Sequence, residues 1–371
     1  MFDIHSAFDQ GSIEQDPAAL KQAISGMYSI DETTLLEQLL PLATPTAGLM
    51  QETTRECADL VKAVRAREDA IHMIDALLLE YSLDTREGVL LMCLAEALMR
   101  IPDSATADAL IRDKLTVADW KQHLKQSRSL LVNASTWGLL LTGKVIRLDA
   151  GIDDEPASVI NRLVNRLSEP VVRQAMHQAM KIMGRQFVLG RTIGEALSNS
   201  TANREAGFTY SYDMLGEAAL TGGDAEDYFA AYSRAIETVG RDSFPADRSP
   251  RPTISVKLSA LHPRYEKTQY HRVMRELGER MLALVSLARK QDVGITIDAE
   301  EADRLEISLD LFEQLYRDPA VRGWGNLGLV VQAYSKRALP VLCWLAALAR
   351  QQGDLIPVRL VKGAYWDSEI K

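Results

Sequence analysis

The chain has 371 residues, of which 47% are hydrophobic and 25% charged, a composition typical of a globular protein of about two domains. Its formal net charge of −9 disfavours nucleic acid or an anionic membrane surface, so we expect no nucleic-acid partner. The N-terminus lacks the apolar segment of a signal peptide, and no run is apolar enough to span a membrane. We therefore expect a cytoplasmic protein, with peripheral association to the inner face of the membrane left open.

The first 205 or so residues are predicted to be almost entirely helical, because apolar side chains recur at helical spacing, for example between residues 67 and 80. Expected helices lie near residues 17–27, 32–41, 67–80, 86–100, 104–112, 116–127, 156–167 and 169–187. We divide this region into two domains. A helical arm over residues 1–66 is expected to lie on another part of the protein, and an α-helical domain covers residues 67–188.

From about residue 208 the pattern changes to short β-rich runs that alternate with amphipathic helices. The runs lie at 208–212, 253–257, 294–298, 327–332 and 357–362, with helices expected near 224–240, 270–290, 301–316 and 336–351. This alternation is typical of parallel βα units, and the nearly continuous apolar runs indicate strands buried on both faces. Residues 189–371 are therefore predicted to form one α/β domain.

Two architectures fit such alternation, an open doubly wound sheet and a (βα)8 barrel. Polar side chains stand at or just past the ends of the five runs, at Asp213, Lys257, Asp298, Gln332 and Lys362. Barrel enzymes keep their chemistry at the carboxyl ends of the strands, whereas an open sheet concentrates its ligand at one switch point. We therefore predict an α/β fold with a helical arm and α-domain followed by an incomplete (βα)8 TIM-type barrel. Closure needs about eight strands, so we expect about three further βα units beyond these five.

Two of these strand-end charges, Lys257 and Asp298, have opposite signs and suit a small zwitterionic substrate. A lysine on the wall of a barrel is unfavourable unless it is paired or used. Lys257 can hold an anion, can form a Schiff base as in an aldolase if its pKa is lowered, or can stand in a structural ion pair. These three interpretations stay open at this point.

The run PVRLVKGAYW at residues 357–366 is the densest candidate site. Arg359 and Lys362 place two positive charges in one strand, and Gly363 allows close approach of the backbone. Tyr365 and Trp366 add flat aromatic faces just past the strand end. Cations beside aromatic walls favour an electron-rich aromatic cofactor that carries phosphates.

Other motifs carry less weight. The three cysteines and six histidines show no disulfide or metal-ligand spacing, so we expect free thiols in a reducing compartment and no metal. The glycine-rich runs 138–144 and 323–328 are similar to nucleotide-binding motifs, but each stands in the wrong structural context. His262, next to Pro263, is expected to be a loop residue near the mouth of a barrel.

Five motifs resemble those of the proline dehydrogenase family, in the family's order and spacing. They are FTYSYDMLGE at 208–217, SVKLS at 255–259, IDAE at 297–300, VQAY at 331–334 and RLVKGAYW at 359–366. The helical region before them resembles the arm and α-domain of the proline utilization A type. The resemblance implies a barrel that holds FAD, oxidises L-proline to Δ1-pyrroline-5-carboxylate by hydride transfer to flavin N5, and passes electrons to a membrane quinone.

The resemblance also implies roles for single residues. Lys257 would bind the substrate carboxylate, and Asp298 would belong to the polar network under the flavin. Lys257, Asp298 and Tyr365 would form the catalytic set, and the substrate pocket would be lined by Lys257, Leu360, Ala364 and Tyr365. FAD would be bound by Gln332, Arg359, Lys362 and Trp366, while Asp213 and Glu217 would support the end of the first strand.

The chain departs from the family pattern in two respects. The paired arginines of a Tyr-x-x-Arg-Arg helix, which complete the carboxylate clamp, are absent, as is the aldehyde dehydrogenase region that normally follows. We therefore expect a piece of a longer protein, inactive in isolation, with a homo-oligomer left open. Residues 1–50 also resemble no ribbon-helix-helix DNA-binding domain. A helical interaction module with a non-catalytic partial barrel stays open as a second hypothesis.

Overall fold

The computed structural model describes residues 2, 4, 7, 15–66, 106, 188–245 and 249–366. Apart from residue 106, the helices predicted between residues 67 and 187 lie outside these residues, as do Cys93 and the run 138–144. The chain divides into two compact units, one formed by Met1–Pro45 with Gly190–Lys371 and the other by Thr46–Leu189. This division cuts the expected arm at Pro45, and the three domains expected from the sequence stay a prediction.

Five parallel strands form the centre of the first unit. They are β1 Ser211–Asp213, β2 Thr253–Val256, β3 Ile295–Ile297, β4 Leu327–Gln332 and β5 Val358–Val361. Their order in the sheet is β1-β2-β3-β4-β5, and every neighbouring pair is parallel. An open doubly wound sheet reverses its strand order at a switch point, which this sheet does not do. The prediction of an incomplete (βα)8 barrel is confirmed.

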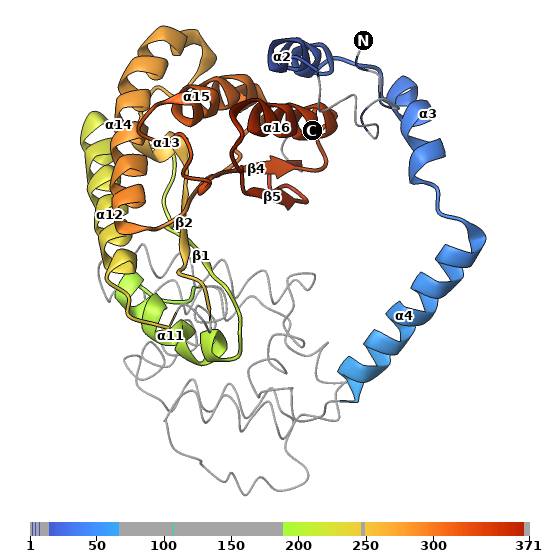
Figure 1. Ribbon diagram of the computed structural model, residues 1–371, viewed down its shortest axis with the longest axis horizontal. Helices are drawn as coiled ribbons and strands as arrows, with labels where there is room; N and C mark the ends of the chain where they lie inside the picture. Colours follow the sequence, from blue (N-terminus) through green and yellow to red (C-terminus); the bar gives the residue numbers. More distant parts are fainter. Residues whose placement is uncertain are drawn as a thin grey trace, which may run out of the picture. The chain divides into compact units, whose positions relative to one another are not determined.

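Helices α12 Gly222–Gly240, α14 Tyr270–Gln291, α15 Leu305–Arg317 and α16 Ala338–Gln352 lie along one face of this sheet (Figure 1). Helix α11 Ile193–Glu205 precedes β1, and the short α13 Leu258–Leu261 follows β2. The 3-10 turns are η4 Lys267–Gln269 and η5 Ala302–Arg304. A capping box begins α12, in which Thr221 Oγ1 accepts from Asp224 N at 3.1 Å and Asp224 Oδ2 accepts from Thr221 N at 2.8 Å. Helix α14 is amphipathic, as expected, and its apolar side chains at Val273, Leu277, Met281, Leu284, Val285 and Ala288 are buried.

Side chains alternate between the two faces of the sheet. One face is apolar and buried under the helices, with Tyr212, Ile254, Val256, Ile295, Ile297, Leu327 and Leu329. The other face carries Ser211 and Ser255, whose Oγ atoms lie 3.2 Å apart. Because Asp213 and Lys257 follow these serines by two residues, they lie on this same inner face. The fold therefore gathers the strand-end charges on one side of the sheet.

The N-terminal helix α2, Pro17–Gly26, packs against α16 although the two are far apart in the sequence (Figure 1). Leu20, Ile24 and Met27 are buried in this contact region. Lys21 Nζ lies 2.6 Å from Asp310 Oδ1 and 2.8 Å from Glu313 Oε2, both on α15. The beginning of the arm is thus held on the barrel helices by apolar and charged contacts together.

Two more arm helices follow, α3 Glu32–Ala43 in the first unit and α4 Ala47–Arg65 in the second. The sequence patterns predicted α3 and missed α4. Thr46 caps α4, since its Oγ1 accepts from Leu49 N at 3.3 Å, and no residue of this helix is buried. A helix without a buried face is hard to find by apolar periodicity, which explains the omission.

We expect Lys21→Met to destabilise the first unit. The change removes two ion pairs of a side chain that is 29% exposed, and it leaves Asp310 and Glu313 without their shared cation. A hydrogen bond to a charged group contributes about 1.5–3 kcal/mol, so a fall in Tm of roughly 3–6 °C is expected by calorimetry. Lys62→Met is the matched control, because Lys62 pairs with Asp59 on the exposed surface of α4. Equal shifts in the two variants would contradict this docking.

Candidate active site

Four charged side chains of alternating sign lie in a row across the carboxyl ends of the strands. Lys257 Nζ lies 2.7 Å from Asp213 Oδ1 and 3.1 Å from Asp298 Oδ2. The other oxygen of Asp298, Oδ1, accepts a hydrogen bond from the Arg359 guanidinium. We call Asp213, Lys257, Asp298 and Arg359 the charge row. It joins β1, β2, β3 and β5, so the structure brings together four residues that the sequence singled out separately.

The charge row keeps Lys257 protonated. Burial alone would lower the pKa of its ammonium, but the hydrogen bond that it donates to Asp213 and the charge of Asp298 outweigh burial and raise the pKa. Burial raises the pKa of the Asp298 carboxyl, against the opposing effect of Lys257 and Arg359. A Schiff-base lysine needs a lowered pKa, so this geometry disfavours the aldolase interpretation.

We expect the stabilising effect of Lys257 to disappear in alkali. The folded-state pKa lies above the ordinary value of about 10.4, so its contribution is complete below that value and is lost as the pH rises through the folded-state pKa. The difference in unfolding free energy between wild type and Lys257→Met should therefore shrink above about pH 10.5, as measured by urea titration. Borohydride with a carbonyl compound should trap no adduct on Lys257. A difference that grows with pH, or a trapped adduct, would contradict this assignment.

The end of β4 and the turn after β5 form a polar site beside the charge row. Gln332 Nε2 donates to the Glu300 carbonyl oxygen at 2.8 Å. Gln332 Oε1 and Arg359 Nε are buried and have no hydrogen-bond partner within the described residues. Gly363 has a φ of 114°, and a Cβ there would lie 2.4 Å from the Tyr334 ring. Unsatisfied polar atoms next to a close backbone approach fit a ligand with a hydrogen-bonding edge, such as a flavin ring.

The remaining predicted residues differ in how close they come to this site. Tyr365 is half-buried, and burial, with a further effect from the charge of Glu217, raises its pKa to about 12. The side chains of Lys362, Ala364, Trp366 and Glu217 are exposed. Leu360 is 58% exposed and alternates with Arg359, so it lies on the opposite face of β5. The structure therefore does not bring Leu360 to the charge row.

Sequence reasoning missed two buried residues that support the site. The Tyr232 hydroxyl of α12 accepts from Lys257 N at 3.2 Å, and burial raises its pKa to about 12. Glu300 lies three residues after the end of β3 and is buried, and this burial raises the pKa of its carboxyl. Arg304 Nη1 lies 3.1 Å from Glu300 Oε2. Glu300 stood inside the IDAE motif, and an acid so close to a buried strand was the available signal. Tyr232 gave no signal, because its position depends on helix packing.

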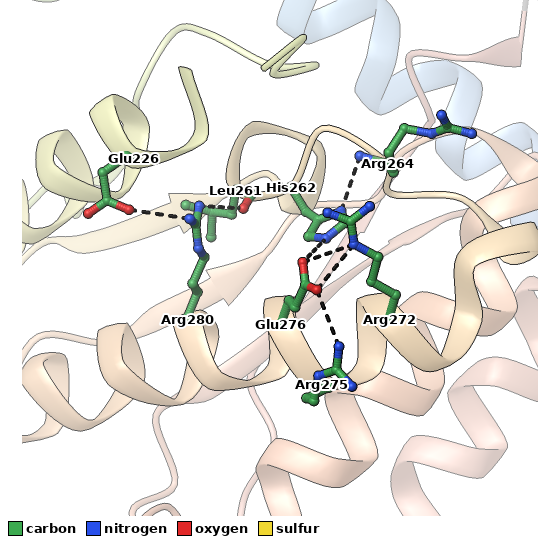
Figure 2. Close-up of polar contacts among 8 residues, drawn as sticks. All are labelled: Glu226, Leu261, His262, Arg264, Arg272, Arg275, Glu276 and Arg280. Atoms are coloured by element: carbon green, nitrogen blue, oxygen red, sulfur yellow. Dashed lines mark hydrogen bonds and ion pairs between the residues drawn. The ribbon is translucent and has the colours of Figure 1, made fainter. Parts of the chain in front are cut away.

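His262 is a buried loop residue, as the sequence predicted. Figure 2 shows its ring facing Glu276 of α14, with Nε2 3.2 Å from Glu276 Oε2. Its Nδ1 accepts from Arg264 N at 3.1 Å, so both ring nitrogens are occupied. Arg272 and Arg275 also contact Glu276 (Figure 2). The glycine-rich run 323–328 leads into β4, and Gly323 N donates to Asp354 Oδ2 at 2.7 Å, so it is a loop as expected.

Comparisons with known proteins identify the family. The family model described as "Proline dehydrogenase" matches residues 196–371. The model "Proline utilization A proline dehydrogenase N-terminal domain" matches residues 18–65, and "DNA-binding domain of Proline dehydrogenase" matches residues 73–187. The chain is 48% identical over 354 residues to Bifunctional protein PutA of Escherichia coli (strain K12), and 49% identical over 357 residues to that of Rhizobium meliloti, with 95% of this chain covered in each case. The chain belongs to the proline dehydrogenase family.

Solved structures and a shorter relative agree with this family. A crystal structure of a mutant of Bradyrhizobium japonicum Proline Utilization A matches with a TM-score of 0.60 and 42% identity, covering 92% of this chain and 34% of that one. Proline dehydrogenase 1 of Bacillus subtilis (strain 168) is 28% identical over 194 residues, which is 51% of this chain and 54% of the relative. This member of the proline dehydrogenase family spans 27% and 28% of the two PutA relatives named above.

One of the matching family models concerns nucleic acid as a partner. The model matched by residues 73–187 is named for DNA binding. Our expectation of no nucleic-acid partner was drawn from the overall charge and from residues 1–50, and it stays a prediction. Within the described ranges, no helix is long and apolar enough to cross a membrane, and no cluster of His, Cys, Asp or Glu could hold a metal ion.

Proposed function

We propose that the protein to which this chain belongs oxidises L-proline to Δ1-pyrroline-5-carboxylate with FAD as cofactor, the first step of proline breakdown toward glutamate. The observation that carries this proposal is the charge row beside the unsatisfied atoms of Gln332 and Arg359. A zwitterionic amino acid needs charges of both signs, and the row offers them within one site. Family membership supports the same reaction class.

Lys257 binds the carboxylate of the substrate in this proposal. Its ammonium has three N–H donors, and two of them are directed at Asp213 and Asp298 in the part of the chain that the structure describes. One donor therefore remains for the substrate. Asp298 and Asp213 hold the ammonium in place, Glu217 supports the end of β1, and Tyr365 and Ala364 line the pocket beside it. The Tyr365 hydroxyl stays protonated at neutral pH, since its pKa is raised to about 12.

Four residues would hold the flavin, namely Gln332, Arg359, Lys362 and Trp366. A bound flavin would supply the acceptor for the hydride that leaves the ring carbon next to the proline nitrogen. Arg359 and Lys362 would supply positive charge beside that cofactor, which would favour its reduction. Gln332 Oε1 and Arg359 Nε would gain the hydrogen-bond partners that they lack within the described residues.

The proposal also includes an electron acceptor and an enzyme that consumes the product. Electrons from the reduced cofactor pass to a membrane quinone, which the cytoplasmic protein reaches by peripheral association. The product needs a dehydrogenase for its aldehyde form, which an aldehyde dehydrogenase region of the same protein would supply. A complex with nucleic acid is not part of this proposal.

A dye-reduction assay tests the proposal on the complete gene product. With FAD bound, L-proline should support reduction of an artificial electron acceptor, and D-proline or no substrate should not. A protein that holds flavin but gives no turnover with L-proline would overturn it.

A further inference from the structure

Ser259, which lies just after β2, contacts the loop that follows β1 and the loop that follows β3. This residue of α13 is 3% exposed and lies two positions after Lys257. Its Oγ accepts from Ala218 N at 3.0 Å, and its carbonyl oxygen accepts from Ala219 N at 2.9 Å. Its own N–H donates to Glu300 Oε1 at 3.0 Å. Ser259 thus contacts the loop after β1 through its hydroxyl and its carbonyl oxygen, and it contacts Glu300 after β3 through both its N–H and its side chain.

The loop after β1 is strained where Ser259 holds it. Ala218 has a φ of 53°, a conformation that costs a residue with a Cβ about 1 kcal/mol or more. Gly216 has a φ of 122°, and a Cβ there would lie 2.4 Å from the Tyr228 ring. Glu217 stands between these two residues and is exposed. Such a backbone persists only where its surroundings fix it, and the two bonds to Ser259 do so.

Through its hydrogen bond to Glu300, Ser259 is also linked to the end of β4. Glu300 is 8% exposed, and its carboxylate is held by Ser259 N on one oxygen and Arg304 on the other. The carbonyl oxygen of Glu300 accepts from Gln332 Nε2. Ser259 is therefore linked to Glu217 on one side and to Gln332 on the other, with Lys257 between them in the chain.

We propose that Ser259, together with Glu300, is a positioning residue that fixes the loop carrying Glu217 and the Gln332 amide around Lys257. This inference rests on the proposed function for its kinetic consequence. Without the Ser259 hydroxyl, the Ala218 N–H loses its hydrogen-bond partner, and the strained loop opens. Substrate binding must then order the loop, so KM rises while kcat changes little.

The test is Ser259→Ala in the complete gene product, with two readouts. Hydrogen exchange of the amides of residues 216–220 should become up to about tenfold faster, because the lost hydrogen bond contributes up to about 1.5 kcal/mol to the closed state. The KM for L-proline should rise about tenfold, with kcat within about twofold of wild type. Ser233→Ala is the matched control, since it removes a serine hydroxyl bond inside α12, to the Phe229 carbonyl oxygen at 2.9 Å.

A second variant separates positioning from general damage. Glycine adopts the backbone of Ala218 without strain, so the KM increase caused by Ser259→Ala should be smaller when Ala218→Gly is also present. Unchanged hydrogen exchange at 216–220 would overturn the inference whether or not the protein is active. So would faster exchange with an unchanged KM in an active enzyme. If wild type turns over no proline, the proposed function fails, and the exchange rates alone decide whether Ser259 holds the loop.

Discussion

Lys257→Met is expected to lower kcat/KM for L-proline by at least about 100-fold in the complete gene product. The variant leaves Asp213 and Asp298 without the cation that lies 2.7 and 3.1 Å from them. The substrate carboxylate would then meet two acids and no ammonium. Flavin content should change little, because the residues proposed to hold the cofactor lie on β4, β5 and the turn after β5. Steady-state kinetics and the flavin absorbance of the same sample measure both effects.

Lys290→Met is the matched control for this variant, because Lys290 is an exposed lysine in the last turn of α14. It should behave like wild type in both measurements. A Lys257→Met enzyme that keeps kcat/KM within about threefold of wild type would remove Lys257 from the substrate site. The charge row would then be a structural ion-pair network.

Gly363→Ala is expected to lower stability by about 2–4 kcal/mol and to reduce flavin content sharply. The positive φ of 114° disfavours any residue with a Cβ, and that Cβ would lie 2.4 Å from the Tyr334 ring and 3.0 Å from Gln332 Oε1. Relief of the clash must move Tyr334 or Gln332. Either movement disturbs the site proposed for the flavin edge.

Gly353→Ala is the matched control, because it introduces the same kind of backbone strain without a steric clash. Gly353 ends α16 with a φ of 65°, and a Cβ there meets no atom within 4 Å. It should cost only about 1 kcal/mol in urea unfolding and leave the flavin-to-protein ratio unchanged. Equal losses in the two glycine variants would mean that backbone strain alone decides, and that Gly363 has no special relation to the cofactor site.

The barrel strands and their polar ends were predictable because both depend on local patterns. Each β-rich run became a strand, and Lys257 and Asp298 lie just past their strands because a parallel sheet brings its carboxyl ends to one edge. The pairing of these two residues followed from their opposite charges. The Arg359 contact with Asp298 did not, since nothing local shows that β5 reaches across β4 to β3.

The residues that were missed depend on tertiary packing. Tyr232 reaches Lys257 N from a helix that precedes β2, and Ser259 contacts Ala218 N and Ala219 N of a distant loop, which no local sequence pattern shows. Leu360 was assigned to the substrate pocket by family resemblance, whereas strand alternation puts it on the face opposite Arg359. The docking of α2 through Lys21 joins residues that are 292 positions apart in the sequence. Apolar periodicity describes only local structure, so it could not predict this contact.

The anaerobic absorption spectrum of the complete gene product, before and after addition of L-proline, tests the central claim most directly. Flavin bands that bleach with L-proline are the predicted result, since they would show cofactor, substrate and direction of electron flow in one sample. A colourless protein, or flavin bands indifferent to L-proline, would contradict the proposed function and favour the helical interaction module with a non-catalytic barrel.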